Sequence, residues 1–351
     1  MALFYAPFIP GLQNFIAEII KERLDDVIIH KLLDGAVLFE TKTNYDKLNF
    51  FCFNNIFAVI SIMEHTEKHN ALEKHIRAFL DGSGGASVKE AEDANQIIAN
   101  NSKSFNTFRI VISDENKPAS IDEKLRVEAE KAICRLSSLK VNRALPDAEF
   151  WFLFRREDGL KMQNFSVFMK RLTVRSSWEK TLHKGELPPP LSWILCRLAN
   201  LVHSDTVLDP FCGYGSIPDA ALKHFHIKNF IACDNDREAA SYCAARFKKK
   251  EGFVLHKGDF SELPFIIKEK KVDVIITDPP WGHYKEINDS DFYKKMFELF
   301  CGLLKEGGRA VVLCANDDLF LRAVPVCFEL QSSIPILLSG RKAVIFVFRR
   351  K

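Results

Sequence analysis

The sequence lacks the closely paired cysteines of a zinc module or a disulfide framework. Its nine cysteines are scattered along the chain, and no two of them stand in C-x-x-C spacing. Such spacing supplies the thiolate ligands of many structural zinc sites, and regular cysteine patterns mark disulfide-rich secreted domains. We therefore expect reduced thiols and no metal.

Long apolar runs and an excess of charge of one sign are also missing. No stretch reaches the roughly 18 uncharged apolar residues of a membrane span, and "MALFYAPFIPGLQNF" lacks the basic start of a secretion signal. Lysine and arginine number 49 against 46 aspartate and glutamate residues. Composition alone therefore does not indicate nucleic acid binding, which depends on local clusters of charge. We expect a cytoplasmic, monomeric protein that is not embedded in a membrane.

The chain of 351 residues is long enough for two or three domains, and its first part indicates a small α+β unit. After the helix-breaking pair Pro10 and Gly11, apolar residues recur at helical spacing from Leu12 to Ile20. Strand-like runs follow at residues 27–29, 35–40 and 58–63.

Residues 66–172 indicate a second α+β unit. A polar, Gly/Ser-rich stretch at 81–104 is typical of a loop, and the patterns after it predict a strand at 107–113, a helix at 121–136 and a strand at 148–156. The segment 173–190 is basic and ends in three prolines, which disfavour helix and stiffen the chain. We take this segment as a linker.

Residues 191–351 indicate an α/β domain. Helical and strand patterns alternate there, with helices at 191–202, 216–225, 236–249 and 290–304 and strands at 206–209, 229–233, 253–256, 272–277 and 309–314. Alternation of this sort is typical of a parallel sheet covered by helices.

The stretch "VLDPFCGYGS" (207–216) joins an apolar strand to a helix through a glycine-rich loop. The lysine of a phosphate-binding G-x-x-x-x-G-K-[ST] loop is absent after Gly215, and Pro218 stands where a G-x-G-x-x-G motif has its third glycine. Nucleoside triphosphate and nicotinamide cofactors are therefore disfavoured.

Acidic residues stand at the ends of three successive strands. Asp209 ends the first and Asp234 the second, where a carboxylate can accept both hydroxyls of a ribose. Asp259 follows the third, where it could accept a hydrogen bond from an adenine amine. The trio suits an adenosine that carries a sulfonium amino acid, although each acid alone is also typical of a strand end or a helix cap.

The fourth strand ends in "DPPWG" (278–282). The two prolines fix an extended turn, and Trp281 offers a flat face on which a base can stack. Asp278 and the Pro279 carbonyl can accept hydrogen bonds from an exocyclic amine and aim its lone pair at a methyl sulfonium. The alternative is a tight turn whose tryptophan caps the core.

Taken in order, "DPFCGYG", "DND", "GDF" and "DPPWG" resemble motifs I to IV of the class I, Rossmann-like S-adenosylmethionine-dependent methyltransferases that modify exocyclic amines. The resemblance implies S-adenosyl-L-methionine as the cofactor and a catalytic group of Asp278, Pro279, Pro280 and Trp281. It implies cofactor contacts from Asp209, Phe211, Gly213, Gly215, Asp234, Asn235, Asp259 and Phe260. The nucleophilic cysteine of 5-methylcytosine enzymes is absent from motif IV, and Cys212 does not replace it.

The N-terminal half resembles the THUMP-containing RNA guanine-N2 methyltransferases in "PGLQNFIAEII", "KVNRALPDAEFWFLFRREDGLKMQNFS" and "LHKGELPPPLS". This implies a ferredoxin-like domain (1–65), a THUMP RNA-binding domain (66–172), a linker (173–190) and a Rossmann-like methyltransferase domain (191–351). It also implies a tRNA substrate that is methylated at the N2 amine of an acceptor-stem guanosine.

Basic residues concentrate near the end of the second unit and in the linker. We expect phosphate contacts from Arg155, Arg156, Lys161, Lys170, Arg171, Arg175, Lys180 and Lys184. A solvated basic face is the alternative.

The stretch "HTEKHNALEKH" places His65 and His69 four residues apart, as zinc ligands on a helix would be. The glutamate is Glu67 rather than the residue after His65, and no third ligand is evident, so a charged, solvated helix is favoured.

Two other functions stay open. The acceptor could instead be adenine N6 in RNA or DNA, or a glutamine amide, because the acid-Pro-Pro-aromatic motif serves these amines too in the family. Alternatively, the methyltransferase domain is a catalytically silent scaffold of an RNA-binding protein.

Overall fold

A computed structural model of the chain describes residues 1–43, 48, 50–83, 95–100, 105–115, 117–157, 163–172, 182–267, 271–280, 291–315 and 318–351. The chain forms two compact units. The first comprises Met1–Phe8, Gln13–Asn49 and Asn54–Arg175, and the second Ile9–Leu12, Phe50–Phe53 and Ser176–Lys351.

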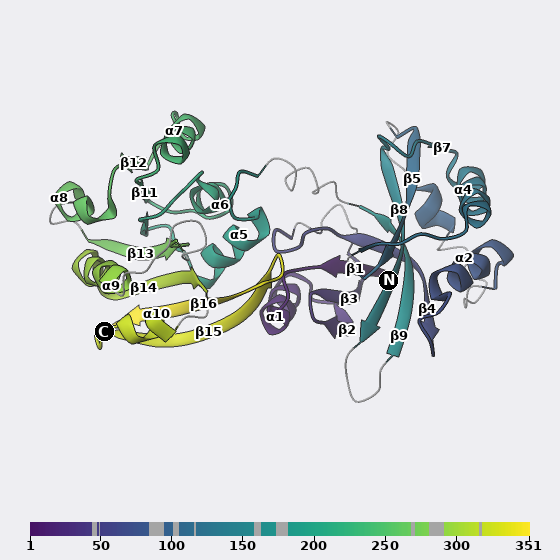
Figure 1. The fold of residues 1–351 in the computed structure, drawn as a ribbon, viewed down its shortest axis with the longest axis horizontal. Helices are drawn as coiled ribbons and strands as arrows, with labels where there is room; N and C mark the ends of the chain where they lie inside the picture. The colour runs from purple at the N-terminus through teal and green to yellow at the C-terminus, as the bar shows by residue number, and fades with distance from the viewer. Residues whose placement is uncertain are drawn as a thin grey trace. The chain divides into compact units, whose positions relative to one another are not determined.

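The first unit is built on one sheet, in the order β2–β3–β1–β4–β9–β8–β5–β6, with β7 paired to β5 (Figure 1). Its elements are β1 (Ala2–Pro7), α1 (Gln13–Arg23), β2 (Ile28–Leu33), β3 (Ala36–Thr41), β4 (Phe57–His65), α2 (Ala71–Asp81), β5 (Thr107–Asp114), β6 (Lys117–Pro118), α4 (Glu123–Ser137), β7 (Lys140–Val141), β8 (Ala148–Glu157) and β9 (Gln163–Arg171). Because β4 pairs with both β1 and β9, the two predicted α+β units share this sheet.

Helices α2 and α4 cover part of this sheet with their apolar sides. Ile76 of α2 and Ile133 of α4 are fully buried against Phe108, Phe150 and Phe152 of strands β5 and β8. The helix expected at 121–136 is confirmed as α4, and the Asp122 side chain caps it by accepting the Leu125 amide at 3.0 Å.

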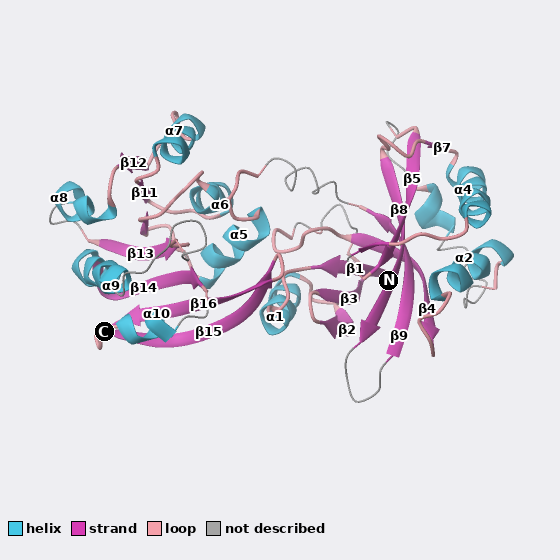
Figure 2. Cartoon of the chain, viewed as in Figure 1, coloured by secondary structure: helices cyan, strands magenta, loops and turns pink. Residues whose placement is uncertain are grey.

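The second unit contains a seven-stranded sheet in the order β12–β11–β10–β13–β14–β16–β15. Its elements are α5 (Pro189–Leu198), β10 (Thr206–Asp209), α6 (Ser216–His224), β11 (Asn229–Asp234), α7 (Arg237–Arg246), β12 (Phe253–Lys257), η3 (Phe260–Glu262), α8 (Leu263–Ile267), β13 (Val272–Thr277), α9 (Asp291–Leu303), β14 (Leu304–Cys314), α10 (Asp318–Ala323), β15 (Phe328–Leu338) and β16 (Arg341–Arg350). Strands β10 to β14 are parallel, and β16 and β15 are antiparallel additions. Figure 2 shows the alternation of helices and strands that the sequence predicted.

Two short segments from early in the chain belong to this second unit. The backbone of Pro10 accepts a hydrogen bond from the Leu337 amide of strand β15 at 3.1 Å. The Phe51 ring lies 6.3 Å from the Trp193 ring of α5 and 3.9 Å from the His224 ring of α6. The second unit therefore needs residues that the sequence assigned to the N-terminal domain.

Replacing Gly11 by alanine should destabilise the second unit. Gly11 has φ of 96°, and a Cβ there would lie 2.0 Å from the Pro335 carbonyl oxygen. We expect a loss of about 2–3 kcal/mol of unfolding free energy in thermal or urea denaturation. Gly340 is the matched control, since it has φ of 80° with open space around the same position, so Gly340→Ala should cost only about 1–2 kcal/mol. Equal losses of unfolding free energy in the two variants would contradict a clash between the added Cβ at position 11 and the Pro335 carbonyl.

Among the described helices, none has the length and apolar character to cross a membrane. The described residues also contain no cluster of three or more histidine, cysteine, aspartate or glutamate side chains that could hold a metal ion.

Candidate active site

The acidic residues singled out in the sequence meet at one edge of the second sheet. Asp209 ends β10 and Asp234 ends β11. Asp278 directly follows β13, and Asp259 comes after Gly258, which follows β12. Since these strands are parallel neighbours, their carboxyl ends lie at the same edge, which is where open α/β sheets bind ligands.

Asp209 is a fully buried carboxylate with one unused oxygen. Its Oδ1 accepts hydrogen bonds from the Thr277 hydroxyl at 2.7 Å and the Phe211 amide at 3.1 Å. Within the described residues, Oδ2 has no hydrogen-bond partner. Burial raises the pKa of Asp209 to about 7, and the charge of Asp234 adds to this rise while the two hydrogen bonds oppose it. Such a group is suited to a positively charged donor.

The glycines of the loop after Asp209 are needed for its shape. Gly213 and Gly215 have φ of 52° and 91°, and the Gly213 amide donates to Asp234 Oδ2 at 2.7 Å. A Cβ at Gly215 would lie 2.8 Å from the Phe247 ring and 3.0 Å from the sulfur of Cys243. The loop thus passes close to the end of α7 and leads into α6, which only residues without a Cβ allow at these positions.

Asp234 and Asp259 each have structural partners as well as the ligand roles predicted for them. Asp234 Oδ1 accepts the Asp236 amide at 2.8 Å, and Asn235 beside it is exposed. Asp259 Oδ1 caps η3 by accepting the Ser261 amide at 3.0 Å and hydroxyl at 2.6 Å. A carboxylate offers more lone pairs than these contacts use, so the ribose and adenine contacts stay predictions.

An aromatic group lines the same strand ends. The Phe211 ring centroid lies 5.1 Å from that of Phe260 and 5.7 Å from that of Phe292, and Phe260 and Phe292 are 5.8 Å apart. All three side chains are partly buried. Phe292, at the start of α9, was not predicted as a site residue, because nothing in its aromatic-rich helix distinguishes it from the core residue Tyr293.

The predicted catalytic turn begins where β13 ends. Asp278 is half-buried, Pro279 is buried and Pro280 is exposed. The preceding residue, Thr277, is fully buried and donates to Asp209, so the first and fourth motifs are joined by one hydrogen bond. Trp281 lies outside the described residues, and its stacking role stays a prediction.

Known proteins resemble the part of the chain that contains this site. Residues 176–327 match the RMKL-like methyltransferase domain family. The second unit is accordingly called the methyltransferase domain below.

Two relatives and one solved structure are also similar to the chain. A tRNA (guanine(10)-N2)-dimethyltransferase of Methanocaldococcus jannaschii is 30% identical over 206 residues, covering 52% of this chain and 54% of the relative. The chain thus spans about half the length of that relative. A tRNA (guanine(6)-N2)-methyltransferase of Thermus thermophilus is 24% identical over 249 residues, covering 70% and 72%. The crystal structure of TrmN from Thermus thermophilus aligns over 100% of both chains with a TM-score of 0.76 and 19% identity. The Rossmann-like methyltransferase fold is confirmed.

Cys212 in the glycine-rich loop of the methyltransferase domain is not poised as a nucleophile. Its side chain is buried, and a hydrogen bond with the Cys243 thiol, burial and the nearby Asp209 charge all raise the pKa of the Cys212 thiol. Since the thiolate is the reactive form, Cys212 is a structural thiol.

Outside the methyltransferase domain, Lys170 does not occupy the surface expected of an RNA contact. It is 3% exposed, and its ammonium donates to the carbonyl oxygens of Ile97 at 3.0 Å, Ile98 at 3.4 Å and Asn100. Burial lowers the pKa of Lys170 to about 8. These carbonyls lie at the end of the helical residues 95–99, so Lys170 caps that helix end inside the first unit.

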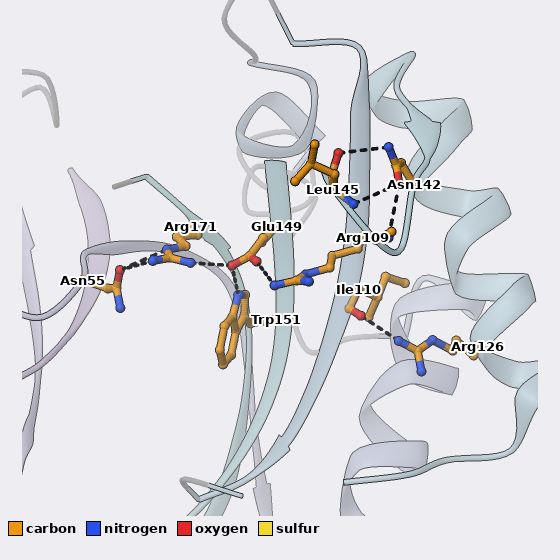
Figure 3. Close-up of polar contacts among 10 residues, drawn as sticks. Asn55, Arg109, Ile110, Arg126, Asn142, Leu145, Glu149, Trp151 and Arg171 are labelled. Carbon is orange, nitrogen blue, oxygen red and sulfur yellow. Dashed lines mark hydrogen bonds and ion pairs between the residues drawn. The ribbon is translucent and has the colours of Figure 1, made fainter. Parts of the chain in front are cut away.

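Arg171 is likewise used internally, as Figure 3 shows. Its guanidinium donates to Glu149 Oε2 at 2.7 Å and to the Asn55 side-chain oxygen at 2.6 and 3.0 Å. Glu149 also accepts hydrogen bonds from the Arg109 guanidinium and from the Trp151 indole N–H, the latter at 3.1 Å. Burial would raise the pKa of Glu149, but the bonds and charges of these partners outweigh it and lower the pKa. We therefore withdraw Lys170 and Arg171 from the expected RNA contacts.

The other predicted RNA contacts differ in their surroundings. Arg155 donates to the Asp34 carbonyl at 3.2 Å, and the exposed Arg156 pairs with Glu115 at 3.1 Å. Lys184 is exposed. Lys161, Arg175 and Lys180 lie outside the described residues.

Charge reversal at Lys170 should act on stability rather than on RNA affinity alone. In Lys170→Glu a carboxylate faces three carbonyl oxygens in a buried site, so we expect a loss of about 3 kcal/mol or more in thermal denaturation. Arg156→Glu, on the surface of the adjacent strand, should change stability by no more than about 0.5 kcal/mol. Wild-type stability of Lys170→Glu would mean that the buried position is wrong.

The expectation of a helix at the "HTEKH" stretch is wrong, because its residues lie at the end of a strand and in the bends and turns before α2 begins at Ala71. His65 ends strand β4, and its Nε2 lies 2.7 Å from the Ser166 hydroxyl of β9. His75 of α2 shares that hydroxyl at 2.7 Å and also contacts Ser61 at 2.8 Å. Burial, the main cause, lowers the pKa of His75 to about 3, so it is a neutral core residue.

Proposed function

We propose that the chain is an S-adenosylmethionine-dependent methyltransferase that methylates the exocyclic N2 amine of a guanosine in tRNA. The observation that carries this proposal is the buried Asp209 carboxylate, whose Oδ2 lacks a hydrogen-bond partner among the described residues. Its Oδ1 accepts the hydroxyl of Thr277, the residue directly before Asp278. A buried carboxylate oxygen without a donor is costly unless a ligand supplies one. The two relatives, named as tRNA guanine-N2 enzymes, support the choice of acceptor.

The residues at this sheet edge fit the proposed cofactor. We expect Asp209 to accept hydrogen bonds from the ammonium of its amino acid part, and Asp234 from its ribose hydroxyls. The partly buried rings of Phe211, Phe260 and Phe292 suit the flat, apolar faces of adenine. When bound, S-adenosyl-L-methionine supplies an electrophilic methyl group on a positively charged sulfur.

The acceptor amine depends on this chain's own residues for its reactivity. A guanine N2 amine is a poor nucleophile because its lone pair is delocalised into the ring. We expect Asp278 and the Pro279 carbonyl to accept its two N–H groups, which fixes the nitrogen and favours its pyramidal form. The amine loses one proton as its nitrogen gains a carbon, and the Asp278 carboxylate is the group that we expect to receive it.

The remaining expectations belong to the same proposal. They are a ferredoxin-like domain at 1–65, a THUMP domain at 66–172, a linker at 173–190, a methyltransferase domain at 191–351, an acceptor-stem target, a monomeric state and a cytoplasmic location. For phosphate contacts we retain Arg155, Arg156, Lys161, Arg175, Lys180 and Lys184.

Nucleoside mass spectrometry distinguishes this function from its alternatives. Unmodified tRNA, RNA and DNA pools are incubated with the full chain and methyl-labelled cofactor, and the digested nucleosides are separated. Label in N2-methylguanosine from tRNA supports the proposal. Label in N6-methyladenosine would change the acceptor to adenine. Label in a protein that is incubated separately, detected by peptide mass spectrometry, would change it to a glutamine amide. Cofactor binding without transfer to any pool would favour a silent scaffold.

A further inference from the structure

A tight turn stands directly before the first helix of the methyltransferase domain. The Glu186 amide donates to the His183 carbonyl at 3.0 Å, and Gly185 has φ of 84°, as the third residue of a type II turn requires. The Glu186 carboxylate closes the same turn a second time, because its Oε2 accepts the His183 amide at 3.1 Å. The turn is therefore held by its own residues.

The same carboxylate links the turn to two helices. The Glu186 side chain is only 8% exposed, and its Oε1 accepts the Ser216 hydroxyl at 3.2 Å and the Arg246 guanidinium at 3.3 Å. Ser216 is the first residue of α6, directly after Gly215 of the cofactor loop. Arg246 ends α7 and also reaches Asp219 of α6 at 3.0 Å.

The imidazole of the turn stacks on the cofactor loop itself. The rings of His183 and Tyr214 are 4.1 Å apart and tilted by only 4°, and Tyr242 of α7 meets the His183 ring edge-on at 4.6 Å. Tyr214 is the residue between the two loop glycines. The turn thus contacts Tyr214 of the loop through the stack, and Ser216 at the end of the loop through the hydrogen bond.

A loop with two glycines in left-handed conformations has much backbone freedom to lose. The described contacts restrain it from two directions. The Asp234 carboxylate holds the Gly213 amide at 2.7 Å, and the turn holds Tyr214 and Ser216. A loop restrained in this way binds its ligand with a smaller entropic penalty.

We propose that the turn at 183–186 is a positioning element of the cofactor site, in which Glu186 and His183 hold the glycine loop in its ligand-binding shape. Neither residue need touch the ligand, since both act through Tyr214 and Ser216. This inference rests on the proposed function, because it assumes that the loop receives S-adenosylmethionine.

The test measures the affinity of the full chain for S-adenosylmethionine by isothermal titration calorimetry. In Glu186→Gln, the side chain keeps its size but has one acceptor oxygen for the three donors. In His183→Ala the stack is lost. We expect the Kd to rise about tenfold in each, equivalent to about 1.4 kcal/mol. His183→Phe keeps a flat ring over Tyr214 and should restore near wild-type affinity, and His226→Ala is the control at an exposed histidine of the same unit.

Two further readouts separate positioning from general damage. The thermal midpoint without cofactor should stay near the wild-type value in His183→Phe and His183→Ala, whereas the rise on adding cofactor should shrink in His183→Ala alone. In turnover, the KM for the cofactor should rise and kcat should hold. Unchanged Kd in both Glu186→Gln and His183→Ala, or a fall in kcat with an unchanged KM, would overturn the inference. If wild-type protein does not bind the cofactor, the proposed function fails instead.

Discussion

Asp278→Ala is expected to remove methyl transfer while leaving cofactor binding intact. Asp278 follows β13, is half-buried and begins the proposed catalytic turn, but the buried oxygen that we assign to the cofactor belongs to Asp209. Loss of an acceptor that acts mainly on the reacting amine should lower kcat by about a hundred- to a thousandfold. Single-turnover methylation and calorimetry on the same preparation measure the two properties.

Glu251→Ala is the matched control for Asp278→Ala. Glu251 is an exposed carboxylate in the turn between α7 and β12, away from the carboxyl ends of the strands. It should keep wild-type turnover and affinity. Substantial residual transfer in Asp278→Ala would contradict the role assigned to Asp278, and a parallel loss of cofactor affinity would show that the turn shapes the cofactor site.

The second large effect is a dependence of cofactor affinity on pH that comes from Asp209. Burial raises the pKa of this carboxyl to about 7, and an ammonium ligand binds its ionised form. Affinity should therefore be full above about pH 7 and should fall by about tenfold for each further unit of acidification. In Asp209→Asn the affinity should drop about a hundredfold at neutral pH, and this pH dependence should disappear.

The raised pKa of Asp209 also predicts that the folded protein without cofactor loses stability as pH rises, whereas cofactor affinity increases. The folded protein keeps a proton on Asp209 up to about pH 7, whereas in the unfolded chain the carboxyl has its ordinary pKa of 3.8 and releases the proton there. The stability contributed by the protonated form is thus present at acid pH and lost as pH rises through about 7. Without cofactor, Asp209→Asn should therefore melt at a higher temperature than wild type above about pH 7. A pH-independent wild-type Kd, or an Asn variant that is less stable at every pH, would contradict this account.

The sequence predicted the site's framework because that framework is local. Strand–loop–helix patterns with an acid at each strand end identified Asp209, Asp234, Asp259 and Asp278, and the structure brings these four to one sheet edge. Parallel strands make this inference reliable, since their carboxyl ends must meet.

The sequence was less informative for strands that break local rules. Strands β15 and β16 were not predicted, since β15 has a polar stretch and contains Pro335. Proline is acceptable there because β15 is the last strand of the sheet and pairs with another strand, β16, along only one of its edges. Strand β1 was missed for another reason, as its short run leads at once into Pro7 and Pro10.

Charged residues with distant partners were also beyond local patterns. Lys170 and Arg171 look like a basic surface pair, yet their partners Ile97 and Asn55 lie 73 and 116 residues away in the chain. Likewise, the sequence placed Glu186 in the linker, because its contact with Ser216 exists only once α6 has packed beside it.

The central claim is that this chain methylates the exocyclic N2 amine of guanosine in tRNA, and it can be tested by removing that amine. Once the methylated guanosine has been mapped, a transcript carrying inosine at that position lacks only the N2 amine. Label transfer from the cofactor is measured to both transcripts at equal bound fraction. We predict transfer to the guanosine transcript and none to the inosine transcript. Equal labelling of the two would contradict the assignment.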